Sequence, residues 1–170
     1  MKSFKQHINE EKDITKYSSK DLSKNGKHGK LNIVFSKFLY MDNSEQGKAA
    51  SGQPKEKEEG TALYMTITKD TSGKYLYPKN SFHVGYDRVN TDGQTVMGWT
   101  GTARLVTYDK KDALDYIKKF GNVSFQKKQI EKGEKGWNAW PPTYDLTGDF
   151  IGQGPGSKIK RIKSLKDIKY

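Results

Sequence analysis

The chain has 170 residues, enough for one domain with tails, but only 32% are hydrophobic and the mean hydropathy is −0.95, so we do not expect a core along its whole length. The formal net charge of +11 suits nucleic acid, an anionic lipid surface or an acidic protein as a partner, although a lysine-rich surface can also serve solubility alone. Cysteine is absent and no apolar run could cross a bilayer, which excludes disulfides, thiolate-bound metal or iron–sulfur clusters, and a membrane-spanning helix.

The first sixty residues alternate between polar segments and one apolar run. Residues 1–30 are polar and mixed in charge, which predicts an extended N-terminal arm; they have no apolar signal core and make a poor organellar transit peptide. Residues 31–41 (LNIVFSKFLYM) suit a buried strand, although a short apolar run also fits a helix. Residues 42–60 are rich in Gly, Ser, Lys and Glu, so we predict a mobile insertion.

Three segments with a period of two follow. Apolar residues alternate through 61–69, through 81–87 and through 102–108, and each pattern predicts a strand with one buried face. Turn signals at 70–73 (DTSG) and 90–93 (NTDG) separate the first two strands and end the second. Antiparallel pairing is therefore expected.

One helix is expected after these strands. Asp109 can cap it, Asp112 suits the positive end of its dipole, and Gly121 suits its C-terminal end. Its apolar stripe is Ala113, Tyr116, Ile117 and Phe120. Val123 and Phe125 then predict a further strand. The fold class is thus α+β over residues 31–128: a small antiparallel sheet with one packed helix and long extended N- and C-terminal arms.

Residues 129–170 predict an extended C-terminal arm that is aromatic and basic. Aromatic residues flanking a Pro-Pro pair could stack on single-stranded bases or anchor in a groove of a protein, and the prolines favour the groove. We therefore expect a protein partner. The predicted anchors are Trp137, Trp140, Pro141, Pro142, Tyr144, Lys160, Arg161 and Lys163.

No catalytic constellation stands out. The histidines His7, His28 and His83 are far apart and lack metal-ligand spacing, and His83 falls on the polar side of its strand, which is typical of a surface or interface histidine. Glycines between 148 and 156 lack the order of a phosphate-binding loop, and there is no nucleophile elbow. We predict no catalytic residue, no cofactor and no metal, and a small enzyme is the least favoured hypothesis.

The stretch 82–121 carries the most specific motifs of the chain. They are FHVGYD at 82–87, VMGWTGT at 96–102, VTY at 106–108, KKDA at 110–113 and KFG at 119–121. In this order they resemble the accessory subunit of mitochondrial NADH:ubiquinone oxidoreductase (complex I) called iron–sulfur protein 4. The residues that carry the resemblance, and that we expect at an interface, are Met97, Gly98, Trp99, Thr100, Asp112, Ala113 and Gly121.

The resemblance implies a non-catalytic accessory subunit that binds no cluster. Such a subunit clamps the NADH-oxidising module to the quinone-reducing module of the matrix arm, with core and accessory subunits of the respiratory complex as partners, on the matrix side of the mitochondrial inner membrane. The sequence departs from the family in its short segment after Trp99, in the insertion 42–60 and in the Pro-Pro tail. The family's short basic C-terminal motif is not reproduced either.

The alternative is a basic nucleic-acid-associated module. The turn at 88–94, the helix that follows and residues 137–140 (WNAW) loosely resemble the Trp-Gly-Arg domain of DNA-break sensors, but the defining triplet is absent. Arginine reads bases better than lysine, and this chain has only Arg88, Arg104 and Arg161. Steep salt dependence of DNA affinity would favour this alternative.

Overall fold

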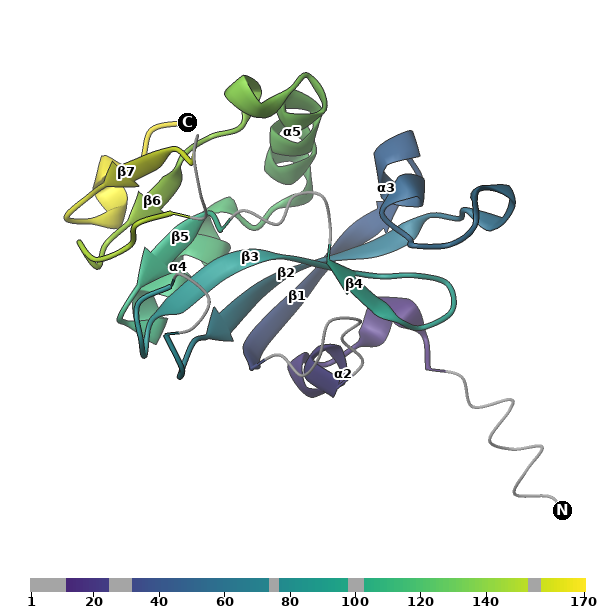
Figure 1. The fold of residues 1–170 in the computed structure, drawn as a ribbon, viewed down its shortest axis with the longest axis horizontal. Coiled ribbons are helices and arrows are strands. Elements are labelled where there is room, and N and C mark those ends of the chain that lie inside the picture. Colours follow the sequence, from purple (N-terminus) through teal and green to yellow (C-terminus); the bar gives the residue numbers. More distant parts are fainter. Residues whose placement is uncertain (1–11, 25–31, 74–76, 98–102, 153–156) are drawn as a thin grey trace, which may run out of the picture.

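The computed structural model describes residues 12–24, 32–73, 77–97, 103–152 and 157–170, and it places seven strands in one sheet (Figure 1). The strands are β1 (Ile33–Asp42), β2 (Thr61–Lys69), β3 (Phe82–Val89), β4 (Thr95–Met97), β5 (Leu105–Thr107), β6 (Thr143–Asp145) and β7 (Ile159–Arg161). The α-helices are α2 (Ser19–Lys24), α3 (Glu45–Ala49), α4 (Lys110–Phe120) and α5 (Val123–Glu134), and the 3₁₀ turns are η1 (Ile14–Lys16), η2 (Lys55–Lys57), η3 (Trp137–Ala139) and η4 (Leu165–Asp167). The fold combines helices with a sheet, as the sequence predicts, but its described residues form a seven-strand sheet and four α-helices in place of the small antiparallel sheet and single helix expected.

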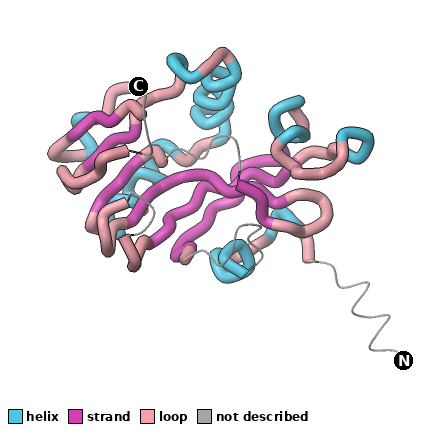
Figure 2. Tube along the Cα trace, in the orientation of Figure 1, coloured by secondary structure: helices cyan, strands magenta, loops and turns pink. Residues whose placement is uncertain are grey.

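The sheet has the order β1-β2-β3-β5-β6-β7, with β4 also paired to β3 (Figure 2). Pairing is antiparallel from β1 through β5 and parallel from β5 through β7. The central strand β2 is buried from Thr61 through Ile67. Leu63, Met65 and Ile67 face α4 within the main core, and the alternate residues face the other side. Side chains of β2 are therefore buried on both faces of the sheet.

Helix α4 forms where the sequence predicts it. The Asp109 carboxylate accepts a hydrogen bond from the Lys111 amide at 2.9 Å, and the Gly121 amide donates to the Ile117 carbonyl at 2.7 Å. A Cβ at Gly121 would lie 2.4 Å from that carbonyl oxygen, so the helix end favours glycine. The predicted stripe of four apolar residues is buried against the sheet.

The strand predicted at Val123 and Phe125 is wrong, because these residues open helix α5. The Asn122 side chain accepts from the Phe125 amide at 2.8 Å and caps the helix. The residues that follow are largely Gln, Lys and Glu, which favour helix, and two alternating apolar residues do not outweigh this preference.

The C-terminal segment differs from the extended arm expected from the sequence. After α4 and α5 the chain returns to the sheet, and β6 pairs in parallel with β5 through the amides of Tyr144 and Leu146. Strand β7 then pairs in parallel with β6. The two helices supply the long crossover that the parallel pair of β5 and β6 needs. Tyr144, Phe150 and Ile162 are buried there, so this segment extends the core.

The insertion 42–60 contains α3 and η2 and is tied to the sheet by buried polar groups. Arg88 of β3 donates to Asp42 at 2.8 Å and to the Thr61 hydroxyl at 3.0 Å. Burial tends to raise the pKa of Asp42, but hydrogen bonds from Ser44 and Arg88 outweigh it and hold the pKa below its usual value. A Cβ at Gly47 would lie 2.3 Å from the Asp42 carbonyl oxygen, so this close approach requires glycine.

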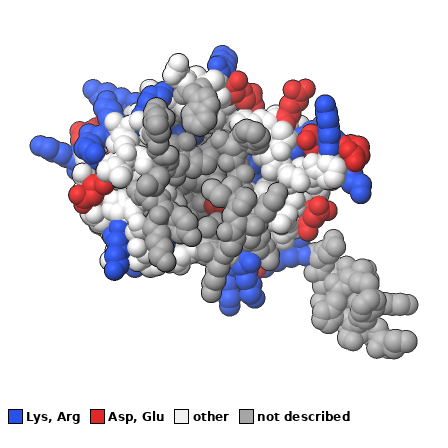
Figure 3. Space-filling view, in the orientation of Figure 1, with Lys and Arg blue, Asp and Glu red and all other residues white. Residues whose placement is uncertain are grey.

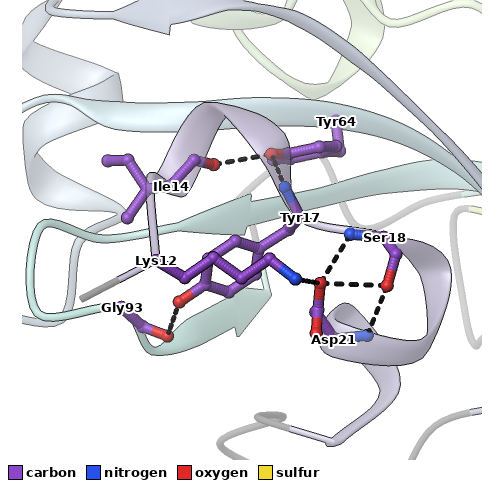
Figure 4. A network of polar contacts seen from close by, with 7 residues as sticks. All are labelled: Lys12, Ile14, Tyr17, Ser18, Asp21, Tyr64 and Gly93. Carbon is purple, nitrogen blue, oxygen red and sulfur yellow. Dashed lines mark hydrogen bonds and ion pairs between the residues drawn. The ribbon is translucent and has the colours of Figure 1, made fainter. Parts of the chain in front are cut away.

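The segment 12–24 also differs from an extended arm, because it docks on the sheet face opposite α4 (Figure 4). The Tyr64 hydroxyl donates to the Ile14 carbonyl at 2.6 Å and accepts from the Tyr17 amide at 2.8 Å. The Tyr17 hydroxyl donates to the Gly93 carbonyl at 2.9 Å. Leu22 of α2 is fully buried beside Tyr64. These contacts make the segment part of the folded domain.

We expect Leu22→Ala to lower the free energy of unfolding by about 2 to 5 kcal/mol, because it leaves a cavity in this second cluster. Urea denaturation followed by fluorescence measures the change. Lys20→Ala, an exposed change in the same helix, is the matched control and should leave the midpoint unchanged. Equal midpoints for both variants would mean that the segment is a detachable arm.

Candidate functional site

The sheet face opposite α4 carries two separate apolar clusters with a polar gap between them. One cluster is Leu22, Ile33, Ala62, Tyr64 and Val89, and the other is Tyr77, Ala103, Val106 and Phe150. Between them, Thr66 of β2 lies opposite Gly85 of β3, and Asp87 lies two residues further along the same face. We name this place, defined by Thr66, Gly85 and Asp87, the central hollow.

Gly85 forms an open floor of the central hollow. A Cβ built at Gly85 would meet no atom within 4 Å, and the residue is only half-buried in the middle of the sheet. Figure 3 shows a depression near the middle of the view, with acidic atoms visible inside it. Asp87 is the only acidic residue of these two strands. The Asp87 carboxylate therefore lies on the same face of β3 as this open position.

Asp87 has no cation beside it in the described part of the chain. It is 6% exposed, and its Oδ2 accepts from the Thr66 hydroxyl at 2.7 Å. The four ion pairs among the described residues involve other acids. Burial raises the pKa of Asp87 to about 6, and the Thr66 hydrogen bond offsets this only in part. Near neutral pH the site therefore holds a negative charge that its surroundings stabilise poorly.

His83 lies on the same face of β3, beyond Gly85, and is partly buried. Its ring stacks on Tyr77 at 4.1 Å between centroids, and Tyr77 stacks on Phe150 at 5.2 Å. Burial lowers the pKa of His83 to about 4, so the imidazole is neutral at pH 7. Four residues along a strand span about 13 Å, so His83 and Asp87 do not form an acid–base pair. The hollow suits binding of a charged group better than proton transfer between these residues.

The two groups should give opposite pH dependences of stability. The pKa of Asp87 is raised from 3.8 to about 6, so its contribution is fully present below pH 4 and is lost as the pH rises to about 6. The pKa of His83 is lowered from 6.5 to about 4, so its contribution is present above pH 6.5 and is lost as the pH falls to about 4. In the wild-type protein the two nearly cancel in this window.

We expect Asp87→Asn to remove the first contribution and leave the second. The free energy of unfolding should then rise between pH 4 and pH 6.5 by up to about 3 kcal/mol, and the variant should exceed the wild-type protein most at neutral pH. Denaturation at a series of pH values measures this. Glu131→Gln, which removes one exposed charge, is the control and should run parallel to the wild-type curve. A parallel curve for Asp87→Asn would contradict the argument.

A second polar feature, centred on Arg104, lies on the α4 side of the sheet. The Arg104 guanidinium is 1% exposed and lies between the Tyr86 ring at 5.5 Å and the Trp140 ring at 4.6 Å. No acid in the described segments pairs with it, and its Nε and Nη1 are buried without a hydrogen-bond partner there. Aromatic faces thus provide the compensation that a carboxylate usually gives.

Trp140 covers this guanidinium because α5 lets it approach closely. A Cβ at Gly133 would lie 1.5 Å from a ring carbon of Trp140. The indole therefore packs over Gly133 and Arg104 within its own chain. Trp140 therefore has a packing role within the domain, and its role as an anchor for a partner stays a prediction.

We expect Gly133→Ala to destabilise the protein by about 1 to 3 kcal/mol, because the methyl group displaces Trp140. In a Trp140→Ala background the same change should instead stabilise it by about 1 kcal/mol, since alanine favours helix and no clash remains. A double-mutant cycle from urea denaturation measures the coupling. Additive effects would show that Trp140 does not pack against Gly133.

The residues that carry the family resemblance have separate roles in the structure. Met97 ends β4, with its backbone opposite Asp87, whereas Gly98, Trp99 and Thr100 lie outside the described residues. Asp112 lies in the first turn of α4. Ala113 is buried against the sheet, and Gly121 ends the helix. Ala113 and Gly121 therefore serve the packing and the end of the helix. The prediction that these residues form an interface stays a prediction.

The predicted tail anchors lie on several elements. Trp137 begins η3, while Pro141 and Pro142 are half-buried before β6. The buried Tyr144 donates its hydroxyl to the Lys169 carbonyl at 2.7 Å. Arg161 pairs with Asp145. Lys160 and Lys163 are exposed.

Sequence reasoning missed Asp87 and Arg104. The alternation through 81–87 puts Asp87 on the face away from Phe82, Val84 and Tyr86, next to a glycine, and this was the available signal. No such sequence signal marked Arg104, because its burial depends on Trp140, which is distant in sequence. In the described segments, no group of three or more His, Asp or Glu residues could hold a metal ion, and no helix is long and apolar enough to cross a membrane.

Comparison with known proteins gave no relative. No family model matched the chain, and neither a curated protein nor a solved structure was similar to it.

Proposed function

We propose that this chain is a non-catalytic accessory subunit of respiratory complex I that clamps the NADH-oxidising module to the quinone-reducing module on the matrix side of the inner membrane. The observation that carries the proposal is the order of elements over residues 82–121. Strands β3 and β4, the Met-Gly-Trp sequence, strand β5 and the capped helix α4 follow one another as the resemblance to iron–sulfur protein 4 leads one to expect. This order of elements supports the proposal.

Within this proposal, the antiparallel part of the sheet and α4 make up the unit shared with that family. This is the small antiparallel sheet with one packed helix, formed by β1, β2, β3, β4, β5 and α4. Helix α5 and the parallel strands β6 and β7 are additions of this chain. Their exposed lysines, including Lys160 and Lys163, would speed encounter with acidic surfaces of neighbouring subunits.

The arginines favour a protein partner over the nucleic-acid alternative. Arg88 is buried and paired with Asp42, Arg104 is buried between two aromatic rings, and Arg161 is paired with Asp145. Bidentate contacts to bases need a free guanidinium, whereas two of these are buried and the exposed Arg161 is held by Asp145. Lysines alone would give binding that depends on phosphates and salt and not on sequence.

Native purification of the tagged chain from its source cells tests the proposal. We expect subunits of an NADH-oxidising respiratory complex to co-purify, to survive nuclease treatment, and to lie in the matrix-side membrane fraction. Trp99→Ala in the same experiment should reduce their recovery, because a large aromatic in the family motif is the expected anchor. Recovery of nucleic acid or of nucleic-acid enzymes, with no NADH oxidation, would refute the proposal.

A further inference from the structure

The central hollow combines three properties of a site for a cationic group. Its floor at Gly85 is open, its carboxylate at Asp87 is buried, and no described cation compensates that charge. An ionised carboxylate removed from water is unfavourable unless it is paired. A cation that enters from outside would relieve this penalty.

We infer that the central hollow binds the ammonium group of a lysine side chain from a partner protein, with Asp87 as its ion-pair partner. This inference rests on the proposed function in so far as the lysine belongs to a neighbouring subunit. The site selects one basic residue of a partner, whereas the exposed lysines of this chain attract acidic surfaces. The lysine site and the exposed lysines together would fix how the partner is oriented on this chain.

The surroundings of Asp87 suit lysine better than a metal ion. A divalent cation takes several oxygen ligands, but Asp87 is the only acid of β2 and β3, and Thr66 is its one described hydrogen-bond donor. Lysine carries an apolar stem and a charged head. The apolar cluster around Tyr64 and Val89 borders Asp87 on this face and can cover such a stem.

None of the basic groups near Asp87 on the described elements forms an ion pair with it. His83 is neutral near pH 7 and stacks on Tyr77. Lys12 of the N-terminal segment pairs with Asp21, and Arg88 points into the pair with Asp42. The segment that covers this face at the Tyr64 end contributes backbone groups and apolar side chains to β2.

Carbon-detected NMR titration of Asp87 in the full chain is the first test. In the free protein the carboxyl should titrate near pH 6, and Nα-acetyl-lysine methylamide as the probe should lower this midpoint by at least one unit. The matched probe is Nα-acetyl-norleucine methylamide, which has the stem without the ammonium group, and it should leave the midpoint in place. A midpoint below 4 in the free protein, which means that a lysine of this chain already fills the site, overturns the inference.

Two variants test separately the carboxylate of Asp87 and the open space at Gly85. Asp87→Asn should abolish binding of the lysine probe while the hollow stays open. Gly85→Val keeps the charge but fills the floor, where a Cβ meets nothing within 4 Å, and should weaken the probe at least tenfold with an unchanged melting temperature. Equal affinity for both variants and the wild-type chain overturns the inference.

The same variants in the native purification distinguish the two proposals. Loss of co-purifying protein with Asp87→Asn and Gly85→Val, but not with Glu131→Gln, supports the docking role of the hollow. Full recovery of a respiratory complex with both variants overturns the docking role and leaves the proposed function intact. Loss of a partner that is not a respiratory complex refutes the proposed function and supports the lysine site.

Discussion

Burial of β2 on both faces is the constraint on which the rest of this structure depends. Leu63, Met65 and Ile67 need cover on one side, and α4 supplies it directly after β5. Tyr64 and Ala62 need cover on the other side, where no helix follows along the chain, and the segment 12–24 returns to fill this place. Burying one large apolar side chain contributes about 1.5 to 3 kcal/mol, so a polar N-terminal segment with a single Leu22 is still held firmly.

On the second face, the described residues form two clusters with a gap between them, and the candidate site lies in this gap. The N-terminal segment packs around Tyr64 and Val89, while Tyr77 and Phe150 cover the end near His83. Neither of these two clusters includes the stretch of β3 that carries Gly85 and Asp87. A buried carboxylate that lacks a cation lowers the stability of the isolated chain, and such unfavourable groups are often kept where a ligand compensates them.

The three arginines show three ways to accommodate a guanidinium in one small domain. Arg88 donates to a carboxylate and a hydroxyl, and Arg161 forms an ion pair with Asp145 at the edge of the sheet. Arg104 packs against aromatic rings. Removing the acid from a buried pair strands a charge, whereas removing Trp140 exposes Arg104 to water that can solvate it. Loss of the aromatic cover over Arg104 should therefore cost less stability than loss of the acid that pairs with Arg88.

Helix α4 could be predicted from the sequence because its cap, its apolar stripe and its terminal glycine are all local signals within thirteen residues. The parallel strands β6 and β7 could not, since a three-residue strand is defined by its neighbour and not by its own pattern. The segment 12–24 reads as polar because only Leu22 and its tyrosine contacts tie it down. Asp87 combines both cases. Alternation places it on one face of β3, but its position between two apolar clusters of the described residues depends on distant parts of the chain. A functional site made by a gap between clusters leaves little trace in the sequence, which explains why the motif pointed to residues 97–100 while the structure points to Gly85 and Asp87.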